Sequence, residues 1–344
     1  MKKSDLAPEL NSVLNKCSKL VEPVICDLLN SRIDKKNREI AEYQILTGGK
    51  RLRPALAMIS CQLLGGKETD ALLPAAGLEI IHNYSLIVDD IIDNGTLRRE
   101  KPTVWAKFGK SIAECVAIDY AAATLQAASL SKEPAKISEI FAKAMKTIVD
   151  GEILDILFER QGREGEPYVV ENRYEDITEK EYFKMAGKKT AGLLEACCEA
   201  GGIVASAKEK QLEALKNYGY NLGIAFQIQD DILDIFGEEK TFGKKIGKDI
   251  IETKGGNLVI LFALKNLPEK EKGRILEIMK NKKIENGDIK EAIELISQTN
   301  SRELAYRSGK KFINKAKKSL DLLPKNEWSE VLVNLADFVM EREK

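Results

Sequence analysis

Several residue types are scarce in this sequence, and each scarcity narrows the class of protein. Proline numbers 9 in 344 residues and aromatics make up 6%, whereas Ala, Leu, Ile, Lys and Glu dominate, as is typical of a mostly helical soluble protein. Neither sign of charge is in excess, because Lys plus Arg and Asp plus Glu each total 54. No overall field therefore attracts nucleic acid or an anionic membrane, and any anion site has to be local.

Paired cysteines and long apolar runs are also missing from the pattern. The 6 cysteines form no CxxC pair, and most lie among apolar helical residues, where a reduced thiol packs as a small hydrophobic side chain. No stretch reaches about 18 uncharged apolar residues, and Met1–Leu6 has no apolar run for a signal peptide. These features predict a soluble cytoplasmic protein without a transmembrane segment.

Helical periodicity covers most of the chain. Apolar residues recur at steps of three and four positions, as in Ile80, Ile81, Tyr84, Ile87, Val88 and Ile91. Strand-like alternation is nowhere sustained, and no Gly/Ser-rich linker divides the chain. We therefore predict one all-α domain over residues 1–344, a large helical bundle around a central cavity, with the charged insert Gln161–Lys180 on its surface.

Two clusters of aspartate interrupt this apolar helical sequence. The first is Asp89, Asp90 and Asp93. Aspartate is a poor residue for a helix interior, because its short side chain competes for backbone hydrogen bonds. With about 3.6 residues per turn, Asp89 and Asp93 project from one face and repel each other unless water or a cation neutralises them. Oxygen-only ligands select hard ions such as magnesium.

The second cluster, Asp230, Asp231 and Asp234, repeats this spacing. One such cluster is as compatible with a solvated acidic face as with a metal site. Two matching clusters in apolar surroundings favour the metal site, because both should line an interior cavity. Facing carboxylates from two helices would hold several metal ions, and such sites usually serve a phosphate-bearing ligand.

Basic residues lie close to both clusters in the sequence. They are Lys50, Arg51, Arg53, Arg98, Arg99, Lys189, Lys244 and Lys245. A lone Lys or Arg is usually a solvated surface charge. The order of these residues around the aspartates is what favours a diphosphate site.

Together these segments resemble the trans-isoprenyl diphosphate synthases, also called polyprenyl synthetases, over about the whole chain. Asp89–Asp93 followed by Arg98–Thr103 resembles the DDxxD and RRGxPT segments of that family. Phe226–Asp234 resembles its FQxxDDxxD segment, with a basic loop after it. Gly48–Pro54 and Tyr182–Thr190 match two further segments.

The resemblance implies a role for each matched position. Its principal magnesium ligands would be Asp89, Asp93 and Asp230, supported by Asp90, Asp231 and Asp234, with about three ions bridging the allylic diphosphate. Contacts to the allylic diphosphate would come from Arg98, Lys189 and Lys244, and contacts to isopentenyl diphosphate from Lys50, Arg53, His82 and Arg99. The catalytic positions that face the developing carbocation would be Thr190 and Gln227, beside Lys189. A homodimer is typical of the family.

Some positions depart from the pattern of the family. Glu100 replaces a usual Gly, Trp105 stands where His is common, and Glu152 replaces Gln ahead of Asp155. The segment after Lys254 lacks a Thr-Leu-Pro, which leaves a third basic site open. A lone histidine is more often packed or on the surface than a ligand. The resemblance reverses this for His82, which lies two helical turns before Asp89.

The implied reaction condenses isopentenyl diphosphate with dimethylallyl, geranyl or farnesyl diphosphate and releases diphosphate. In the family that the sequence resembles, an aromatic residue followed by a small one at these positions accompanies products of middle length. By this resemblance Tyr84 and Ser85 imply geranylgeranyl diphosphate as the main product, with a farnesyl or a longer product as the alternative. An ordinary core position stays open for Tyr84. Rival hypotheses are a terpene cyclase, a metal-dependent phosphohydrolase, a non-catalytic helical partner subunit and a structural scaffold. The single histidine argues against the multi-histidine phosphohydrolase.

Overall fold

The computed structural model describes residues 8–237, 246–281 and 283–342, and these are almost entirely helical. The N-terminal half contains α1 (Pro8–Asn30), η1 (Lys35–Asn37), α2 (Arg38–Leu46), α3 (Leu52–Leu63), α4 (Glu68–Ile92), β1 (Leu97–Arg98), β2 (Lys101–Pro102), α5 (Val104–Phe108), α6 (Lys110–Leu130) and α7 (Pro134–Leu157). In the described residues the only paired strands are β1 and β2, a two-residue antiparallel hairpin. The prediction of an all-α fold is confirmed.

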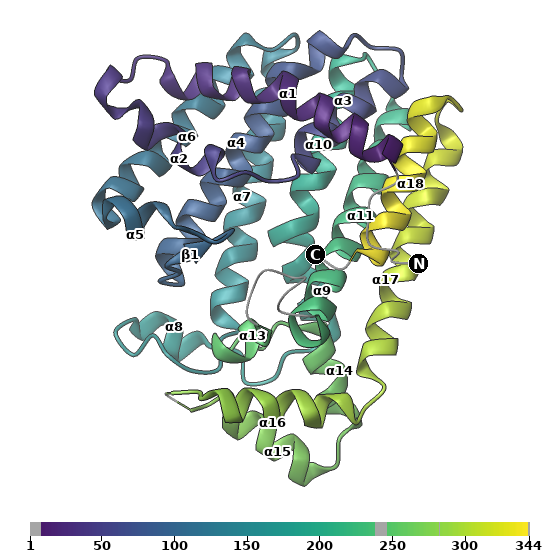
Figure 1. Ribbon diagram of the computed structural model, residues 1–344. Coiled ribbons are helices and arrows are strands. Elements are labelled where there is room, and N and C mark those ends of the chain that lie inside the picture. The colour runs from purple at the N-terminus through teal and green to yellow at the C-terminus, as the bar shows by residue number, and fades with distance from the viewer. Residues whose placement is uncertain (1–7, 238–245, 282, 343–344) are drawn as a thin grey trace.

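The second half continues the helical arrangement. It contains α8 (Pro167–Asn172), α9 (Glu179–Ala186), η2 (Gly187–Ala191), α10 (Gly192–Val204), α11 (Glu209–Phe236), α13 (Lys248–Ile251), α14 (Leu258–Asn266), α15 (Glu269–Ile278), α16 (Asn286–Ser297), α17 (Ser301–Ser319), η3 (Leu320–Leu322) and α18 (Glu327–Glu341). In Figure 1, α1 crosses the top, α15 and α16 form the lower end, and α17 and α18 stand at the right.

Helix ends are set by side chains that cap free backbone amides. Thr178 and Glu181 form a reciprocal capping box at the start of α9. Asn257 accepts from the amides of Val259 and Ile260 at the start of α14. Each cap fixes where a helix begins and therefore which residues face the interior.

The core is built around α4, α10 and α11. Helix α4 packs on α3 and α6, and α10 packs on α3 and α11. Gly223 permits the approach of α11 to η2, because a Cβ there would lie 2.9 Å from the Cβ of Ala191. Fully buried Leu56, Leu78 and Leu222 show how completely these helices exclude water.

Helix α4 has the length and apolar composition of a membrane span, the one case among the described helices. Its most apolar 18-residue window is 61% buried inside the protein. Its last turn carries Asp89 and Asp90, and Asp93 follows its end. Such burial is typical of a core helix, and it explains the apolar sequence of α4 without a membrane.

Candidate active site

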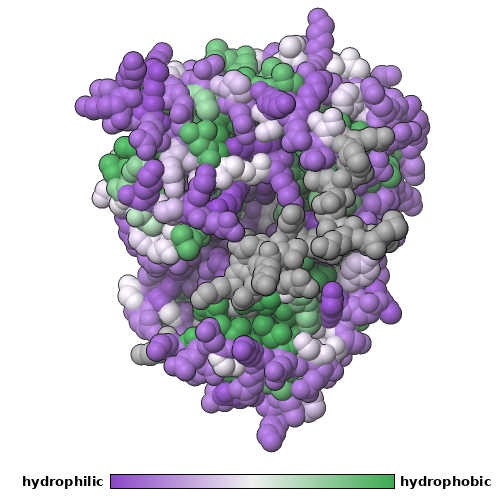
Figure 2. Space-filling model, in the orientation of Figure 1, coloured by the Kyte–Doolittle hydropathy of each residue, from purple (hydrophilic) through white to green (hydrophobic). Residues whose placement is uncertain are grey.

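Both aspartate clusters lie at the C-terminal ends of long helices. Asp93 is the C-cap residue of α4, and Asp234 lies in the last turn of α11. A helix C-terminus already carries partial negative charge, so carboxylates there need cations nearby. The face drawn in Figure 2 is mostly hydrophilic and is hollowed near its centre.

Three basic side chains hold the first cluster. Arg98 donates from Nε to Asp90 Oδ2 over 2.9 Å and from Nη2 to Asp90 Oδ1 over 2.8 Å. The same guanidinium contacts Asp89 at 3.1 Å, and Lys189 Nζ lies 3.3 Å from the other Asp89 oxygen. Lys254 Nζ lies 3.1 Å from Asp93. The third basic site that the sequence left open is therefore at the cluster.

These cations shift the pKa values of the cluster in different directions. Burial raises the pKa of Asp89, but Lys189 and Lys254 outweigh burial and hold that pKa below its usual value. Burial dominates for Asp90 and Asp93, whose pKa values are raised in spite of Arg98 and Lys254. Asp89 is thus the most acidic member of its cluster.

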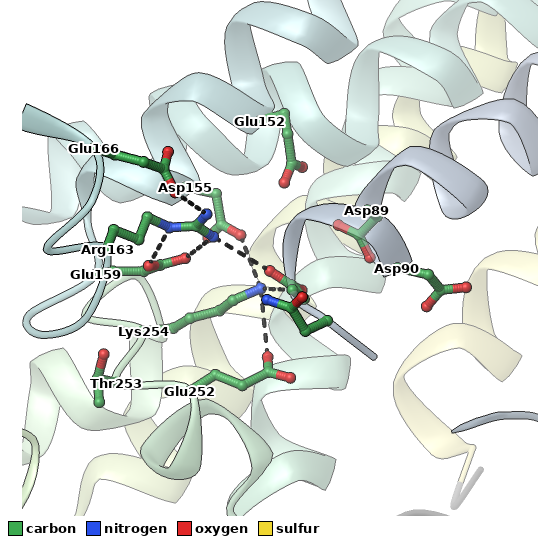
Figure 3. Close-up of polar contacts among 12 residues, drawn as sticks. Asp89, Asp90, Glu152, Asp155, Glu159, Arg163, Glu166, Glu252, Thr253 and Lys254 are labelled. Atoms are coloured by element: carbon green, nitrogen blue, oxygen red, sulfur yellow. Dashed lines mark hydrogen bonds and ion pairs between the residues drawn. The ribbon is translucent and has the colours of Figure 1, made fainter. Parts of the chain in front are cut away.

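Lys189 is shared with two further carboxylates on α7. Its Nζ lies 2.6 Å from Asp155 and 2.7 Å from Glu152. Burial raises the pKa of Glu152 to about 7 against the pull of Lys189. For Asp155, Lys189 and Lys254 outweigh burial and lower the pKa to about 2. Figure 3 shows Asp155 pointing toward Lys254, whose Nζ lies 3.2 Å away.

The charged insert is not wholly a surface excursion, which corrects that part of the prediction. Arg163 is bidentate to Glu159 at 2.7 and 2.8 Å and is paired with Glu166. Its Nη2 also lies 3.8 Å from Asp93. The insert thus supplies a cation to the first cluster, and nothing in its local sequence distinguishes Arg163 from neighbouring surface charges.

The three aspartates of the second cluster have different surroundings. Asp231 is buried and accepts from the amide of Leu258 at 2.9 Å and from Gln227 at 3.0 Å. Both oxygens of Asp234 accept from backbone amides at the start of α13. Asp231 and Asp234 therefore fix neighbouring backbone, whereas the side chain of Asp230 is 40% exposed.

The hairpin that follows α4 determines the positions of Arg98 and Arg99. The hairpin β1–β2 turns at Arg99 and Glu100, whose φ values of 53° and 63° are those of a tight two-residue hairpin turn. Trp105 donates to the backbone oxygen of Asp90 at 2.8 Å and so ties the segment after the hairpin to the end of α4. Arg98 and Arg99 thereby project from adjacent positions of one rigid turn.

A cavity of about 740 Å³ lies beside the clusters. Arg98, Thr190 and Asp230 line it. Its lining also includes all four residues predicted to hold isopentenyl diphosphate, which are Lys50, Arg53, His82 and Arg99. The structure therefore brings the four residues predicted for isopentenyl diphosphate to one cavity with Arg98, one of the residues predicted for the allylic diphosphate. Burial and the nearby arginines hold the pKa of His82 well below its usual value, so this imidazole is neutral at pH 7.

Thr190 lies in η2, a short π-helical segment, and points to α11. Its hydroxyl donates to Gln227 Oε1 at 2.7 Å, and Gln227 in turn donates to Asp231. A single π turn inside a helix often marks a functional site. Here the wider turn presents Lys189 and Thr190 in succession toward the two clusters.

Not every predicted residue can be placed at the site. Lys244 lies outside the described residues. Tyr84 packs partly buried against the core, and Ser85 donates to the backbone oxygen of His82 at 2.8 Å. Neither observation tests their predicted effect on product length.

The donor set fits a hard divalent cation that completes its shell with ligand or water oxygens. Asp89, Asp93 and Asp230 supply carboxylate oxygens, the donors that magnesium prefers. Among the described residues no group of three His, Cys, Asp or Glu side chains is placed to hold an ion by itself. Since magnesium usually keeps several waters and binds substrate phosphates, this arrangement suits an ion that arrives with a diphosphate.

Comparisons with known proteins agree with this geometry. The family model described as polyprenyl synthetase matches residues 34–296. A short chain isoprenyl diphosphate synthase of Methanocaldococcus jannaschii is 38% identical over 319 residues, which cover 91% of this chain and 92% of the relative. A geranylgeranyl diphosphate synthase of Saccharolobus solfataricus is 35% identical over 354 aligned positions, with both chains covered completely.

Solved structures give the same result. The geranylgeranyl pyrophosphate synthetase of Pyrococcus horikoshii superposes with a TM-score of 0.86 at 33% identity, covering 97% of this chain and 98% of that one. A Caulobacter crescentus polyprenyl synthase, complexed with calcium and isoprenyl diphosphate, has a TM-score of 0.88 at 29% identity over both entire chains. This chain belongs to the polyprenyl synthetase family.

Proposed function

We propose that this chain is a magnesium-dependent isoprenyl diphosphate synthase that transfers an allylic prenyl group to isopentenyl diphosphate. The observation that carries the proposal is the composition of the cavity wall. Asp230 and several basic side chains line the same cavity, and so many cations around one space are not needed for a structural role. The family relationship supports the same reaction.

The residues around the first cluster would bind the allylic substrate. Ionisation of its carbon–oxygen bond leaves negative charge on the departing diphosphate. Arg98, Lys189 and Lys254, which are ion-paired with the aspartates of the first cluster, would take up that charge. Magnesium held by Asp89, Asp93 and Asp230 would add Lewis-acid stabilisation to the same leaving group.

The basic wall of the cavity would hold the second substrate. Arg53 and Arg99 are partly desolvated, which lowers their pKa values without discharging them, since a guanidinium stays protonated in proteins. A neutral His82 can donate a hydrogen bond to a diphosphate oxygen without adding charge. The double bond of isopentenyl diphosphate would then attack the allylic cation at a fixed distance.

The carbocation needs stabilisation that does not quench it. Thr190 lines the cavity and its hydroxyl donates its proton to Gln227, so the hydroxyl lone pairs would be available to a positive charge. The cation formed by the condensation loses a proton as the new double bond forms. The departing diphosphate accepts this proton, so no side-chain base is needed in this scheme.

Geranylgeranyl diphosphate is the product we propose, with Tyr84 as the floor of the prenyl tunnel. The names of the Saccharolobus and Pyrococcus relatives support this length. Chromatography of dephosphorylated products tests it: Tyr84→Ala should give longer chains, and an unchanged product distribution would remove Tyr84 from this role.

We further propose that the chain is one domain, acts in the cytoplasm and forms a homodimer. Helices α17 and α18 lie beyond the family match but pack on α11, which supports one domain. Apolar residues stand exposed along α6 and α7, among them Ile118 at 70% and Leu125 at 71% exposure. Such a patch on a soluble protein favours a partner surface.

The decisive experiment measures diphosphate release with magnesium, isopentenyl diphosphate and each of the dimethylallyl, geranyl and farnesyl partners. Release should require both substrates and stop on chelation of the metal. Asp230→Asn should lower kcat by at least about 100-fold, because a transition-state charge stabiliser is lost. The matched control is Asp321→Asn on exposed η3, which should leave the rate unchanged.

Other outcomes would redirect the assignment. No release with any allylic partner would contradict prenyl transfer. Release without isopentenyl diphosphate would favour a cyclase or a phosphohydrolase instead.

A further inference from the structure

The last described residue, Arg342, is seated on the second aspartate cluster. Its Nη2 donates to Asp230 Oδ1 at 2.7 Å and to the backbone oxygen of Phe226 at 2.9 Å. The guanidinium lies over the Phe226 ring, 3.8 Å from its centroid, and the Arg342 backbone oxygen accepts from Gln229 at 2.9 Å. Arg342 is buried, so these contacts hold one defined position.

Arg342 therefore contacts Asp230, the member of the second cluster that is open to a ligand. Asp231 and Asp234 are engaged by amides of the chain, as described above, and Asp230 faces the cavity. Arg342 lines the same cavity. A cation that binds Asp230 from the cavity therefore meets a carboxylate oxygen that already accepts a charged hydrogen bond.

We propose that Arg342 is an internal counter-ion for Asp230, which a metal ion has to displace before it can bind there. The inference rests on the metal site of the proposed function. The Asp230 carboxylate cannot bind Arg342 and a metal ion with full strength at the same time. The pairing with Arg342 therefore raises the metal concentration at which Asp230 is half occupied by metal. The Arg342 Nε is buried without a hydrogen-bond partner in the described structure, so the contacts with Asp230 and Phe226 do not satisfy every donor of the guanidinium.

A counter-ion at this position also fixes the orientation of the Asp230 carboxylate. An unpaired carboxylate near the C-terminal end of α11 would be unfavourable, because that end of a helix carries partial negative charge. Arg342 offsets that repulsion at a distance of 2.7 Å. The aspartates of the first cluster are paired in the same manner with Arg98, Lys189 and Lys254.

The test is a titration of this 344-residue chain with Mn²⁺ in the absence of substrate, in which free Mn²⁺ is read by electron paramagnetic resonance. Arg342→Gln keeps a hydrogen-bond donor and removes the charge. We expect its apparent dissociation constant for Mn²⁺ to fall by roughly three- to tenfold, the range expected for loss of one competing ion pair whose Asp230 side chain is 40% exposed. Arg342→Lys keeps the charge but loses the planar stack on Phe226, so its dissociation constant for Mn²⁺ should lie between those of wild type and Arg342→Gln.

A double-mutant cycle with Asp230→Asn assigns the effect to this pair. In the Asp230→Asn background, Arg342→Gln should no longer change Mn²⁺ affinity. Lys317→Gln is the matched charge control, because Lys317 pairs with Asp337 on α18 away from the cavity. It should leave Mn²⁺ affinity unchanged, and melting of every variant in chelator reports any loss of folding.

The results separate the possible failures. Equal Mn²⁺ affinity in wild type and Arg342→Gln, or an equal gain in the Asp230→Asn background, would overturn the counter-ion role. Unchanged Mn²⁺ binding by Asp230→Asn alone would overturn this inference together with the metal site. Prenyl transfer by the wild-type chain is measured independently, so failure of the proposed reaction is distinguished from failure of the counter-ion.

Discussion

At the scale of single residues, His82 shows how a local field changes an ordinary side chain. It lies in the cavity wall, and burial followed by the charges of Arg53, Arg99, Arg98 and Arg51 lowers its pKa well below the usual value. It is the only histidine of the chain, so its protonation can be followed without ambiguity.

This shift predicts how stability changes in mild acid. Below pH 6.5 the unfolded chain binds a proton at His82 that the folded chain does not, so the histidine's contribution is full above pH 6.5 and is lost as pH falls. One proton can change the free energy of unfolding by at most about 1.4 kcal/mol per pH unit. His82→Gln should therefore flatten the curve of denaturation midpoint against pH between about pH 5 and 6.5. Parallel wild-type and variant curves would contradict a neutral buried His82.

At the scale of secondary structure, the position of Lys189 depends on the fit of η2 against α7. Gly151 lies at their contact, and a Cβ there would overlap the backbone of Lys188 and come within 2.7 Å of Lys189 Cα. Backbone atoms cannot move aside as a flexible side chain can. Gly151 therefore sets how closely Lys189 approaches Asp155 and Asp89.

We expect Gly151→Ala to lower the free energy of unfolding by about 1–3 kcal/mol and to raise KM for the allylic diphosphate. Denaturant melts and steady-state kinetics measure the two effects. The control is Gly273→Ala in α15, where an added Cβ meets nothing and alanine should stabilise the helix by up to about 1 kcal/mol. Gly151→Ala behaving like Gly273→Ala would show that the contact is not tight.

The elements also show what could be predicted from sequence. Helical periodicity is local information, so α4 and α11 and the spacing of Asp89 with Asp93 were predictable, and the structure has them as expected. The different surroundings of Asp230, Asp231 and Asp234 could not be predicted from the sequence. They depend on which amides of α13 and α14 fold back onto α11, and the order of residues along one helix does not contain that contact.

Long-range ion pairs were the least predictable feature. Arg342 reaches Asp230 over 112 positions, and Lys254 reaches Asp93 over 161. Nothing in the sequence near Arg163 or Arg342 marks either as different from a solvated charge. Family resemblance supplied most of the basic residues, but it could not supply a cation that arrives from the charged insert or from the last described residue.

At the scale of the whole molecule, charge and apolar surface are both unevenly distributed. The chain is neutral overall, yet cations are concentrated around the cavity and carboxylates at two helix ends. On the outside, Cys115, Ile118, Ala122 and Leu125 form one exposed stripe on α6, at helical spacing. On the adjoining α7, Val149 and Ile153 are also about half exposed.

This stripe predicts a homodimer that two charges should break. Apolar side chains at successive turns of adjoining helices gain little in water and a substantial free energy against a second copy of the same face. We expect wild type to have twice the chain mass of 38.3 kDa in light scattering, and Ile118→Glu with Leu125→Glu to give the monomer mass. Leu322→Glu, equally exposed on η3, is the matched control and should remain dimeric. A monomeric wild type at micromolar concentration, or a double variant that remains dimeric, would show that α6 is not the partner surface.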